Sequence, residues 1–267
     1  MIVLFTDFGS DGPYTGQVQA RLYQQAPGVA VVNLFSDLVP YEIQAAAYLL
    51  PAYSAGFPPA TVFLCVVDPG VGSVRPGVVV KADGCWYIGP NEGLFALLAR
   101  RAERLECWQL PEPVGVSSSF HGRDVFAPAA ALLATGAAVD AETVPTNCLE
   151  QPDWPDDLFR VCYIDRFGNA ITGVRASELD TTQSLEVSGR VLRAASTFSD
   201  VAPGDAFWYE NSNGLVEVAV NRGRADRVVG IVVGTVIALS ERRPPRDSCH
   251  AKKHSRRGRR SCGSRYM

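Results

Sequence analysis

Short apolar runs alternate with helically patterned segments in the first half of the chain, and this alternation limits the folds open to it. The alternating segments have buried-strand patterns at residues 2–6, 29–34 and 61–67, and helical spacing at residues 14–25, 41–50, 91–101 and 124–133. Residues 78–88 are typical of a hairpin that turns at Asp83 and Gly84. Strands that alternate with helices predict an α/β domain with a largely parallel sheet.

A proline-rich break separates this region from a different pattern. Pro145, Pro152 and Pro155 lie among acidic residues, as in a linker. Beyond them, turns rich in Gly, Asn and Asp separate strand patterns at residues 161–164, 184–191, 206–209, 215–220 and 228–239. We therefore expect an N-terminal α/β domain at 1–145, a linker at 146–158, a smaller antiparallel β-barrel-like C-terminal domain at 159–240, and a tail at 241–267.

The net charge of −3 conceals an uneven distribution, with −11 on residues 1–240 and +8 on residues 241–267. An acidic body argues against an enzyme that grips nucleic acid over a wide surface, and it suits a cationic small-molecule substrate. We expect the basic tail to be disordered. Its lysines and arginines are also compatible with binding nucleic acid or anionic lipid, while its Cys and His spacing matches no zinc pattern.

The apolar runs are too short for a membrane span, because the longest, residues 228–239, has 12 residues where about 20 are needed. No basic segment precedes the first apolar run, so a secretory signal is not expected and the default location is the cytoplasm. The five cysteines in residues 1–240 form no CxxC pair, which favours buried thiols over a disulfide framework.

Two aspartates follow predicted strands at the position where parallel sheets bind ligands. Asp7 follows the first strand and Asp68 the third, and each is followed by a turn that contains glycine. Because the carboxyl ends of parallel strands share one edge of a sheet, we expect both carboxylates on one rim. Taken singly, either aspartate fits equally well as a residue that only caps a turn.

His121 is the only histidine in residues 1–240, and it lies in a glycine-containing loop before a predicted helix. A lone histidine is more often structural than catalytic, and Asp124 beside it fits the role of helix N-cap better than a catalytic role. The loop nevertheless belongs to the predicted rim, and Arg75 follows Asp68 closely enough to fold back toward it. Together Asp68, Arg75 and His121 could hold and polarise a water, an assistance worth roughly 10²–10⁴-fold.

Six motifs occur in order over about residues 1–240: TDFG at 6–9, VDPGVG at 67–72 with Arg75, GPNEG at 89–93, FHGRDVFAP at 120–128, YIDRFGN at 163–169 and NSNG at 211–214. Each motif alone is weak, but the ordered set is specific. The set resembles the S-adenosyl-L-methionine hydroxide adenosyltransferases, which are relatives of the fluorinase and chlorinase enzymes. The basic tail has no counterpart in this resemblance.

The resemblance implies hydrolysis of S-adenosyl-L-methionine (SAM) to adenosine and L-methionine. Activated water or hydroxide would attack ribose C5′ in line with the departing sulfur. The sulfonium is already a good leaving group, so the protein has to orient the substrate and place one water, and neither a metal nor a cofactor is expected. The resemblance also implies a homotrimer, with each site between the N-terminal domain of one chain and the C-terminal domain of its neighbour.

The resemblance also implies roles for residues of the N-terminal region. Asp68, Arg75 and His121 would hold the nucleophilic water and are the catalytic candidates. Asp7 would accept hydrogen bonds from the ribose hydroxyls, which are strong when the acceptor is charged. Tyr41 would line the site beside the reacting centre.

In the C-terminal region the resemblance implies substrate binding. Asp165 would pair with the ammonium of the methionine part, with Ser212 nearby, while Phe167 and Asn169 would stack on and hydrogen-bond the adenine. Without the resemblance, residues 165–169 are better interpreted as a hairpin turn.

Two other functions stay open. Halogenating relatives have tyrosine where Asp68 stands, and a carboxylate repels halide while it can accept a proton from water, so hydrolysis is favoured over halide-dependent adenosyl transfer. A non-catalytic module that binds SAM or adenosine is the other alternative, and the intact catalytic candidates argue against it. The chain departs from the usual family pattern at Gln19 and Glu92, and neither residue is expected to touch the chemistry.

Overall fold

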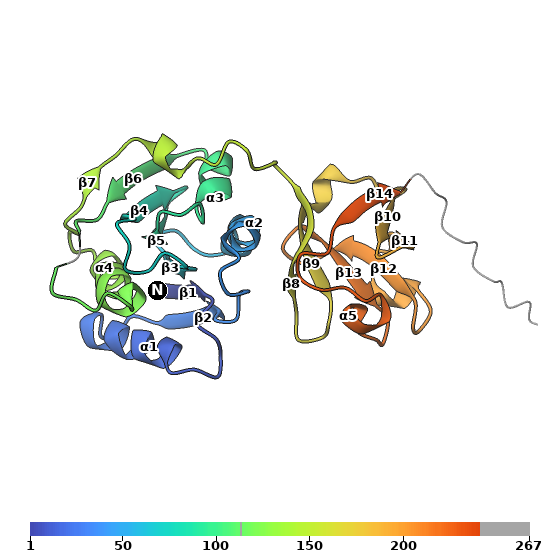
Figure 1. Cartoon of the computed structure of the whole chain (residues 1–267), viewed down its shortest axis with the longest axis horizontal. Helices are drawn as coiled ribbons and strands as arrows, with labels where there is room; N and C mark the ends of the chain where they lie inside the picture. Colours follow the sequence, from blue (N-terminus) through green and yellow to red (C-terminus); the bar gives the residue numbers. More distant parts are fainter. Residues whose placement is uncertain (113, 241–267) are drawn as a thin grey trace, which may run out of the picture.

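The structure is a computed structural model that describes residues 1–112 and 114–240, and the N- and C-terminal parts lie side by side along its length (Figure 1). The predicted basic tail lies outside the described residues. The N-terminal elements are β1 (Ile2–Thr6), α1 (Tyr14–Gln25), β2 (Val31–Phe35), α2 (Ile43–Ser54), β3 (Val62–Val66), β4 (Gly77–Ala82), β5 (Cys85–Pro90), α3 (Ala96–Arg101), β6 (Leu105–Gln109), the π-helical turn η1 (Gly122–Phe126), α4 (Ala127–Ala134), β7 (Glu142–Thr143) and the 3-10 helix η2 (Thr146–Leu149).

A seven-stranded sheet of order β2-β1-β3-β5-β4-β6-β7 forms the centre of the N-terminal part. Strands β2, β1, β3 and β5 pair in parallel, and β4, β6 and β7 join the sheet antiparallel. The predicted α/β fold is confirmed, as is the hairpin at Asp83 and Gly84. Because Thr6 of β1 pairs with Val66 of β3, Asp7 and Asp68 leave the sheet at the same edge, as the pattern predicted.

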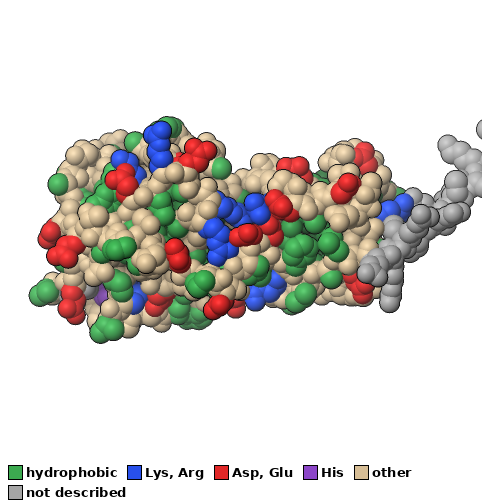
Figure 2. Space-filling model, turned by 90° about the horizontal axis from the view of Figure 1, so that it is seen from above, with side chains coloured by type: hydrophobic (Ala, Val, Ile, Leu, Met, Phe, Trp, Pro, Cys, Tyr) green, Lys and Arg blue, Asp and Glu red, His purple; other side chains and the backbone are tan. Residues whose placement is uncertain are grey.

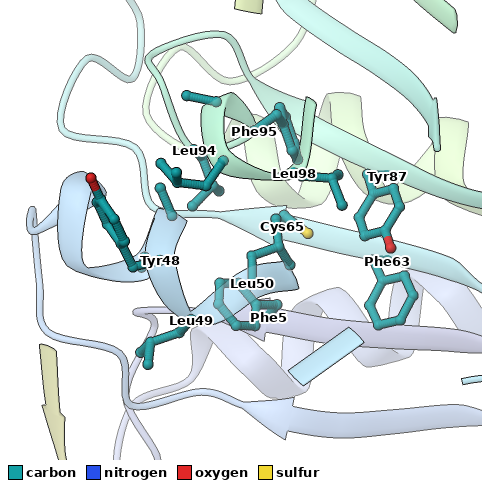
Figure 3. Close-up of a cluster of buried hydrophobic side chains, with 14 of the residues drawn as sticks. Phe5, Tyr48, Leu49, Leu50, Phe63, Cys65, Tyr87, Leu94, Phe95 and Leu98 are labelled. Carbon is teal, nitrogen blue, oxygen red and sulfur yellow. The ribbon is translucent and has the colours of Figure 1, made fainter. Parts of the chain in front are cut away.

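Helices cover both faces of this sheet because its strands are apolar on both sides. Alternate residues of β1 point to opposite faces, so that Phe5 packs with α2 and α3 while Leu4 packs with α1 and α4. Figure 3 shows the first of these cores, in which Phe63 of β3 and Tyr87 of β5 stack with ring centroids 4.9 Å apart. Close packing on both faces fixes the position of the sheet, and Asp7 and Asp68 leave it at its carboxyl edge.

The C-terminal part consists of β8 (Leu158–Ile164), β9 (Ala170–Arg175), the 3-10 helix η3 (Ala176–Glu178), β10 (Ser184–Val187), β11 (Arg190–Arg193), the 3-10 helix η4 (Phe198–Asp200), β12 (Ala206–Glu210), β13 (Leu215–Val220), α5 (Ala225–Val228) and β14 (Ile237–Ser240). Its sheets have the orders β12-β13-β9-β8 and β11-β10-β14 and are antiparallel. Isolated bridges, Arg160 to Val236 and Ala194 to Trp208, connect their edges. The arrangement is barrel-like, but no continuous closed barrel forms among the described residues.

The two parts contact each other through α2, β8 and the segment that joins them. The Arg100 guanidinium donates to the carbonyl oxygen of Trp154 and to the Asp156 carboxylate, at 2.8 and 2.9 Å, and the Tyr48 hydroxyl donates to the Pro155 carbonyl. Figure 2 shows acidic and basic side chains gathered near the middle of the elongated molecule. These contacts fix the predicted linker to the N-terminal part.

Several predicted elements differ from the observed ones. The helix expected at 41–50 begins only at Ile43, because Tyr41 has a left-handed backbone with φ of 68°. The helix expected at 91–101 begins at Ala96. The strand expected at 228–239 is reduced to β14, since Gly230 and Gly234 at φ of 74° and 89° turn the chain. None of the helices in the described part of the chain is long and apolar enough to cross a membrane.

Candidate functional site

Asp68, Arg75 and His121 form one connected cluster at the carboxyl edge of the sheet. Arg75 Nε donates to Asp68 Oδ1 at 2.7 Å, and Arg75 Nη2 donates to Asp68 Oδ2. Both side chains are nearly buried, at 8% and 6% exposure. A bidentate pair of this kind is strong and directional, so the carboxylate is held in one orientation.

The turn after β3 folds Arg75 back onto Asp68. Ser73 N–H donates to the Gly70 carbonyl at 3.0 Å, and Gly72 adopts φ of 81°. A Cβ at Gly72 would lie 2.5 Å from the Ser118 carbonyl oxygen, so only glycine permits this approach to the loop before η1. The same loop supplies His121, which explains how a residue 46 positions from Arg75 joins the cluster.

The hydrogen bond between Arg75 and His121 fixes the imidazole tautomer. Arg75 Nη2 lies 3.4 Å from His121 Nδ1, and a guanidinium only donates, so Nδ1 accepts and the ring proton resides on Nε2. Burial, followed by the charge of Arg75, lowers the pKa of His121 below its usual value. The neutral ring therefore presents an N–H donor, and Asp68 supplies the acceptor.

Asp7 and Tyr41 also meet, although through the backbone of Tyr41. Its N–H donates to Asp7 Oδ2 at 3.3 Å, which accounts for the left-handed conformation at residue 41. Burial raises the pKa of Asp7, and the Asp68 carboxylate raises it further. The Tyr41 side chain is 74% exposed, so it is free to contact another molecule.

The interpretation of Asp124 as a helix N-cap is wrong. Asp124 lies inside the π-helical turn η1, and no side-chain cap precedes α4. Its carboxylate instead accepts two hydrogen bonds of 2.7 Å from Arg123, which lower the pKa of Asp124. The Arg123 guanidinium lies 5.0 Å from the ring centre of Phe120. This packing orders the loop that carries His121.

A pocket of about 980 Å³ lies mainly in the C-terminal part. The four residues that the resemblance implies for substrate binding all line it: Asp165, Phe167, Asn169 and Ser212. Phe35 and Tyr53 add aromatic surface from the N-terminal part. The Phe167 ring is 73% exposed, so one face is free to stack on a flat ligand.

Residues 165–169 form a hairpin turn, and the turn builds part of the pocket. Asn169 N–H and Nδ2 donate to the two Asp165 carboxylate oxygens at 2.8 and 3.2 Å. A Cβ at Gly168, where φ is 85°, would lie 2.7 Å from Asp226. The structural interpretation of this motif is therefore correct, and the same hydrogen bonds orient Asp165 and Asn169.

Glu217 is a buried carboxyl group beside this turn that the sequence analysis did not select. It accepts hydrogen bonds from the Tyr209 hydroxyl at 2.5 Å and from Asn211 Nδ2 at 3.0 Å, and Asn169 also bonds to it. Burial raises the pKa of Glu217. The sequence around Glu217 does not mark it as buried or functional. Its hydrogen-bond partners come from other strands and loops, which local sequence cannot reveal.

Glu92, which was expected not to touch the chemistry, lies against the turn that follows Asp68. Its carboxylate packs on the backbone of Gly70, where a Cβ would lie 2.0 Å from Glu92 Oε1. Its Oε2 is buried with no hydrogen-bond partner. Burial raises the pKa of Glu92, and the charge of Asp68 raises it further. The N–H of Asn91, the residue before Glu92 in the GPNEG motif, donates to the Pro76 carbonyl at 3.0 Å. This hydrogen bond holds the motif beside the segment that carries Asp68 and Arg75.

The N-terminal and C-terminal candidates do not meet within one chain. None of Asp7, Tyr41, Asp68, Arg75 and His121 lines the C-terminal pocket, and within residues 1–112 and 114–240 no hydrogen bond or ion pair joins the two groups. In Figure 1, α4, which follows the His121 turn, lies on the side of the N-terminal part away from β8–β14. In the same described ranges, His, Cys, Asp and Glu form no cluster of three that could hold a metal ion.

Comparisons with known proteins match both parts. The SAM hydroxide adenosyltransferase N-terminal domain matches residues 2–143, and the C-terminal domain of the same family matches residues 159–238. This chain belongs to the SAM hydroxide adenosyltransferase family. Every motif that carries the resemblance falls within these two matches.

Relatives of the family agree with this assignment. An (R)-S-adenosyl-L-methionine hydrolase of Thermus thermophilus is 40% identical over 257 residues, covering 89% of this chain and 98% of the relative. A crystal structure of an uncharacterized conserved protein from Thermotoga maritima superposes with a TM-score of 0.76 at 28% identity, covering 90% of this chain and 99% of that one. A fluorinase of an Actinoplanes species is more distant, at 22% identity over 297 residues, 90% of this chain and 97% of the fluorinase.

Proposed function

We propose that this protein hydrolyses S-adenosyl-L-methionine to adenosine and L-methionine. The proposal rests chiefly on the Asp68 carboxylate. Both of its oxygens accept hydrogen bonds from Arg75, and a neutral His121 lies beside the pair. Family membership and the hydrolase named among the relatives support the same reaction. A fixed acceptor beside a fixed donor suits the task of holding one water for attack.

In the proposed step the water oxygen attacks ribose C5′ in line with the departing sulfur. The bond from C5′ to oxygen forms as the bond from C5′ to sulfur breaks, and methionine leaves with the electron pair as a neutral thioether. Asp68 takes the proton of the water because His121 carries its own proton on Nε2. His121 donates from Nε2 to the water and orients it.

The proposed substrate contacts divide between the two parts. Asp7 accepts from the ribose hydroxyls, and Tyr41 lines the reacting centre. Asp165 faces the ammonium of the methionine part with Ser212 nearby, while Phe167 and Asn169 bind adenine. The acidic charge of residues 1–240 suits a cationic sulfonium substrate. No cofactor or metal takes part in this scheme.

A homotrimer would bring the two groups of residues together. The N-terminal cluster and the C-terminal pocket occupy separate places in one chain, and Tyr41 and Phe167 expose most of their aromatic surface. A neighbouring chain that places its pocket against this cluster would cover both rings. The cytoplasmic location expected from the sequence also stays a prediction.

The reaction is tested by incubating the purified protein with SAM in halide-free buffer and quantifying the products chromatographically. Equal amounts of adenosine and methionine are expected without added metal. Formation of a 5′-halogenated adenosine only after chloride or fluoride is added would establish halide-dependent adenosyl transfer instead. Binding of SAM with no product under either condition would identify a binding module.

A further inference from the structure

The Glu92 carboxylate is a charged group beside the proposed water site that the reaction scheme leaves unused. It lies against Gly70, two residues after Asp68, and its Oε2 is buried without a hydrogen-bond partner. A buried carboxylate oxygen without a partner is costly, since desolvation of a charge is not recovered by a hydrogen bond. The carboxylate also accepts a hydrogen bond from the Gly70 backbone N–H, a role that the amide oxygen of a neutral glutamine could equally fill.

The effect of the negative charge of Glu92 depends on the charged groups around it. The charge of Asp68 raises the pKa of Glu92 and that of Arg75 lowers it. The charge of Asp68 also raises the pKa of Asp7. Three carboxyl groups therefore share the neighbourhood of one guanidinium, while His121 is neutral. Asp124, which also acts on His121, is compensated by Arg123.

The cluster contains two groups of a kind that binds small anions, beside the Asp68 carboxylate, which repels them. Arg75 carries a positive charge and the neutral His121 presents an N–H, and both are groups that bind halide. Asp68 compensates the charge of Arg75 through its two hydrogen bonds. Asp7 and Asp68 together outweigh Arg75 by one negative charge, and Glu92 adds a second, which repels an anion more strongly but leaves the binding of neutral water unaffected.

We propose that Glu92 is a specificity-determining residue that excludes halide ions from the water position beside Asp68 and Arg75. This inference rests on the proposed hydrolysis of SAM. Glu92 touches neither the water nor the substrate and acts through its charge. The nucleophile then enters as neutral water and loses its proton only at Asp68.

The test measures inhibition of adenosine formation by chloride, at constant ionic strength maintained with gluconate, for the wild type and Glu92→Gln. Glutamine keeps the size of the side chain and removes the charge. We expect chloride to inhibit Glu92→Gln at about a tenfold lower concentration than the wild type. Glu92→Asp keeps the charge and should restore the insensitivity of the wild type to chloride.

Glu106→Gln is the matched control, because it removes the same charge from an exposed position on β6. It should behave as the wild type. Thermal unfolding verifies that each variant is folded, and Glu92→Asn serves as a second neutral variant if glutamine destabilises the turn.

Equal sensitivity to chloride in the wild type and in a folded neutral variant would overturn the role of Glu92 and leave the hydrolase intact. If Glu106→Gln became as sensitive to chloride as Glu92→Gln, the role of Glu92 would also be overturned, because the effect would then follow the net charge of the protein. A wild type that forms no adenosine would overturn the proposed function and this inference together.

Discussion

The N-terminal cluster and the C-terminal pocket differ in how completely one chain builds them. In the cluster, Asp68 and Arg75 are nearly buried and fixed by two hydrogen bonds, and His121 is held in one tautomer. In the pocket, Phe167 and Ser212 are exposed, and much of the volume is open. The groups proposed for bond breaking are thus preorganised. In the pocket, hydrogen bonds orient Asp165 and Asn169, whereas Phe167 and Ser212 are left open to a ligand or a neighbouring chain.

This difference has an energetic reason. A water-activating group contributes most when it needs no reorganisation during the reaction, and a buried bidentate ion pair meets this condition. A pocket that admits a substrate with adenine, ribose and methionine parts has to remain accessible. We therefore expect changes in the cluster to lower kcat and changes in the pocket to raise KM.

The largest effect is expected for Asp68→Asn. Asparagine keeps the shape of the side chain but cannot take up the proton of water, so kcat should fall by roughly 10²–10⁴-fold with little change in KM. Steady-state adenosine formation measures both constants. Asp157→Asn is the matched control, since Asp157 forms a comparable pair with Arg175, at 2.5 and 3.0 Å, away from the cluster. An equal loss of kcat in the control would remove the special role of Asp68.

Mixing two defective variants gives the next largest effect. Asp68→Asn lacks the proton acceptor and Asp165→Ala lacks the proposed ammonium partner, so each should be nearly inactive at low SAM. If each site forms between two chains, random assembly of an equal mixture restores about one quarter of the sites. Half of the clusters and half of the pockets are intact, so about one site in four combines an intact cluster with an intact pocket. The measurement is activity after joint unfolding and refolding, compared with each variant alone. No recovery, with mixed assemblies demonstrated, would place both groups in a site within one chain.

Phe167→Ala should have an intermediate effect confined to binding. The ring is 73% exposed and contributes little to the core, so the thermal midpoint should stay unchanged. Loss of stacking on adenine should raise KM by about tenfold. Measurement of KM together with thermal unfolding separates the two properties. Unchanged KM would show that Phe167 does not bind the substrate.

His121 should give the smallest effect, as a dependence of stability on pH. Its pKa is lowered in the folded chain by burial and by Arg75, so below the usual value of about 6.5 the unfolded chain binds more protons. The wild type should therefore lose stability relative to His121→Gln as pH falls from above 7 to about 5. Thermal unfolding across this range measures the difference. A difference that is constant with pH would contradict the lowered pKa.

The sequence predicted the features that depend on local pattern. Alternating strands and helices led to the α/β sheet, and the adjacency of β1 and β3 puts Asp7 and Asp68 on one edge. Residues 215–220 form β13 as predicted, because an apolar run without glycine, interrupted only by Glu217, marks a buried strand. By contrast, the expected strand at 184–191 is a hairpin, since Ser188 and Gly189 adopt φ of 50° and 76°.

Features set by tertiary contacts could not be predicted. Tyr41 leaves the helical conformation because its N–H binds Asp7, which lies 34 positions earlier. Asp124 was predicted to cap a helix, but it accepts hydrogen bonds from Arg123 and forms an ion pair with Arg21 of α1. Glu92 packs against Gly70 and Glu217 is buried by other strands and loops, so their spacing in the sequence carried no sign of either position. The roles implied by the resemblance for Asp165 and His121 stay predictions.

The most direct test of the account is incubation of the wild type with SAM in ¹⁸O-labelled water without halide, followed by mass spectrometry of the products. Attack of water on C5′ predicts adenosine that carries the label at its 5′ oxygen, together with unlabelled methionine. Unlabelled adenosine, or the absence of adenosine while SAM remains bound, would contradict activation of water by Asp68, Arg75 and His121.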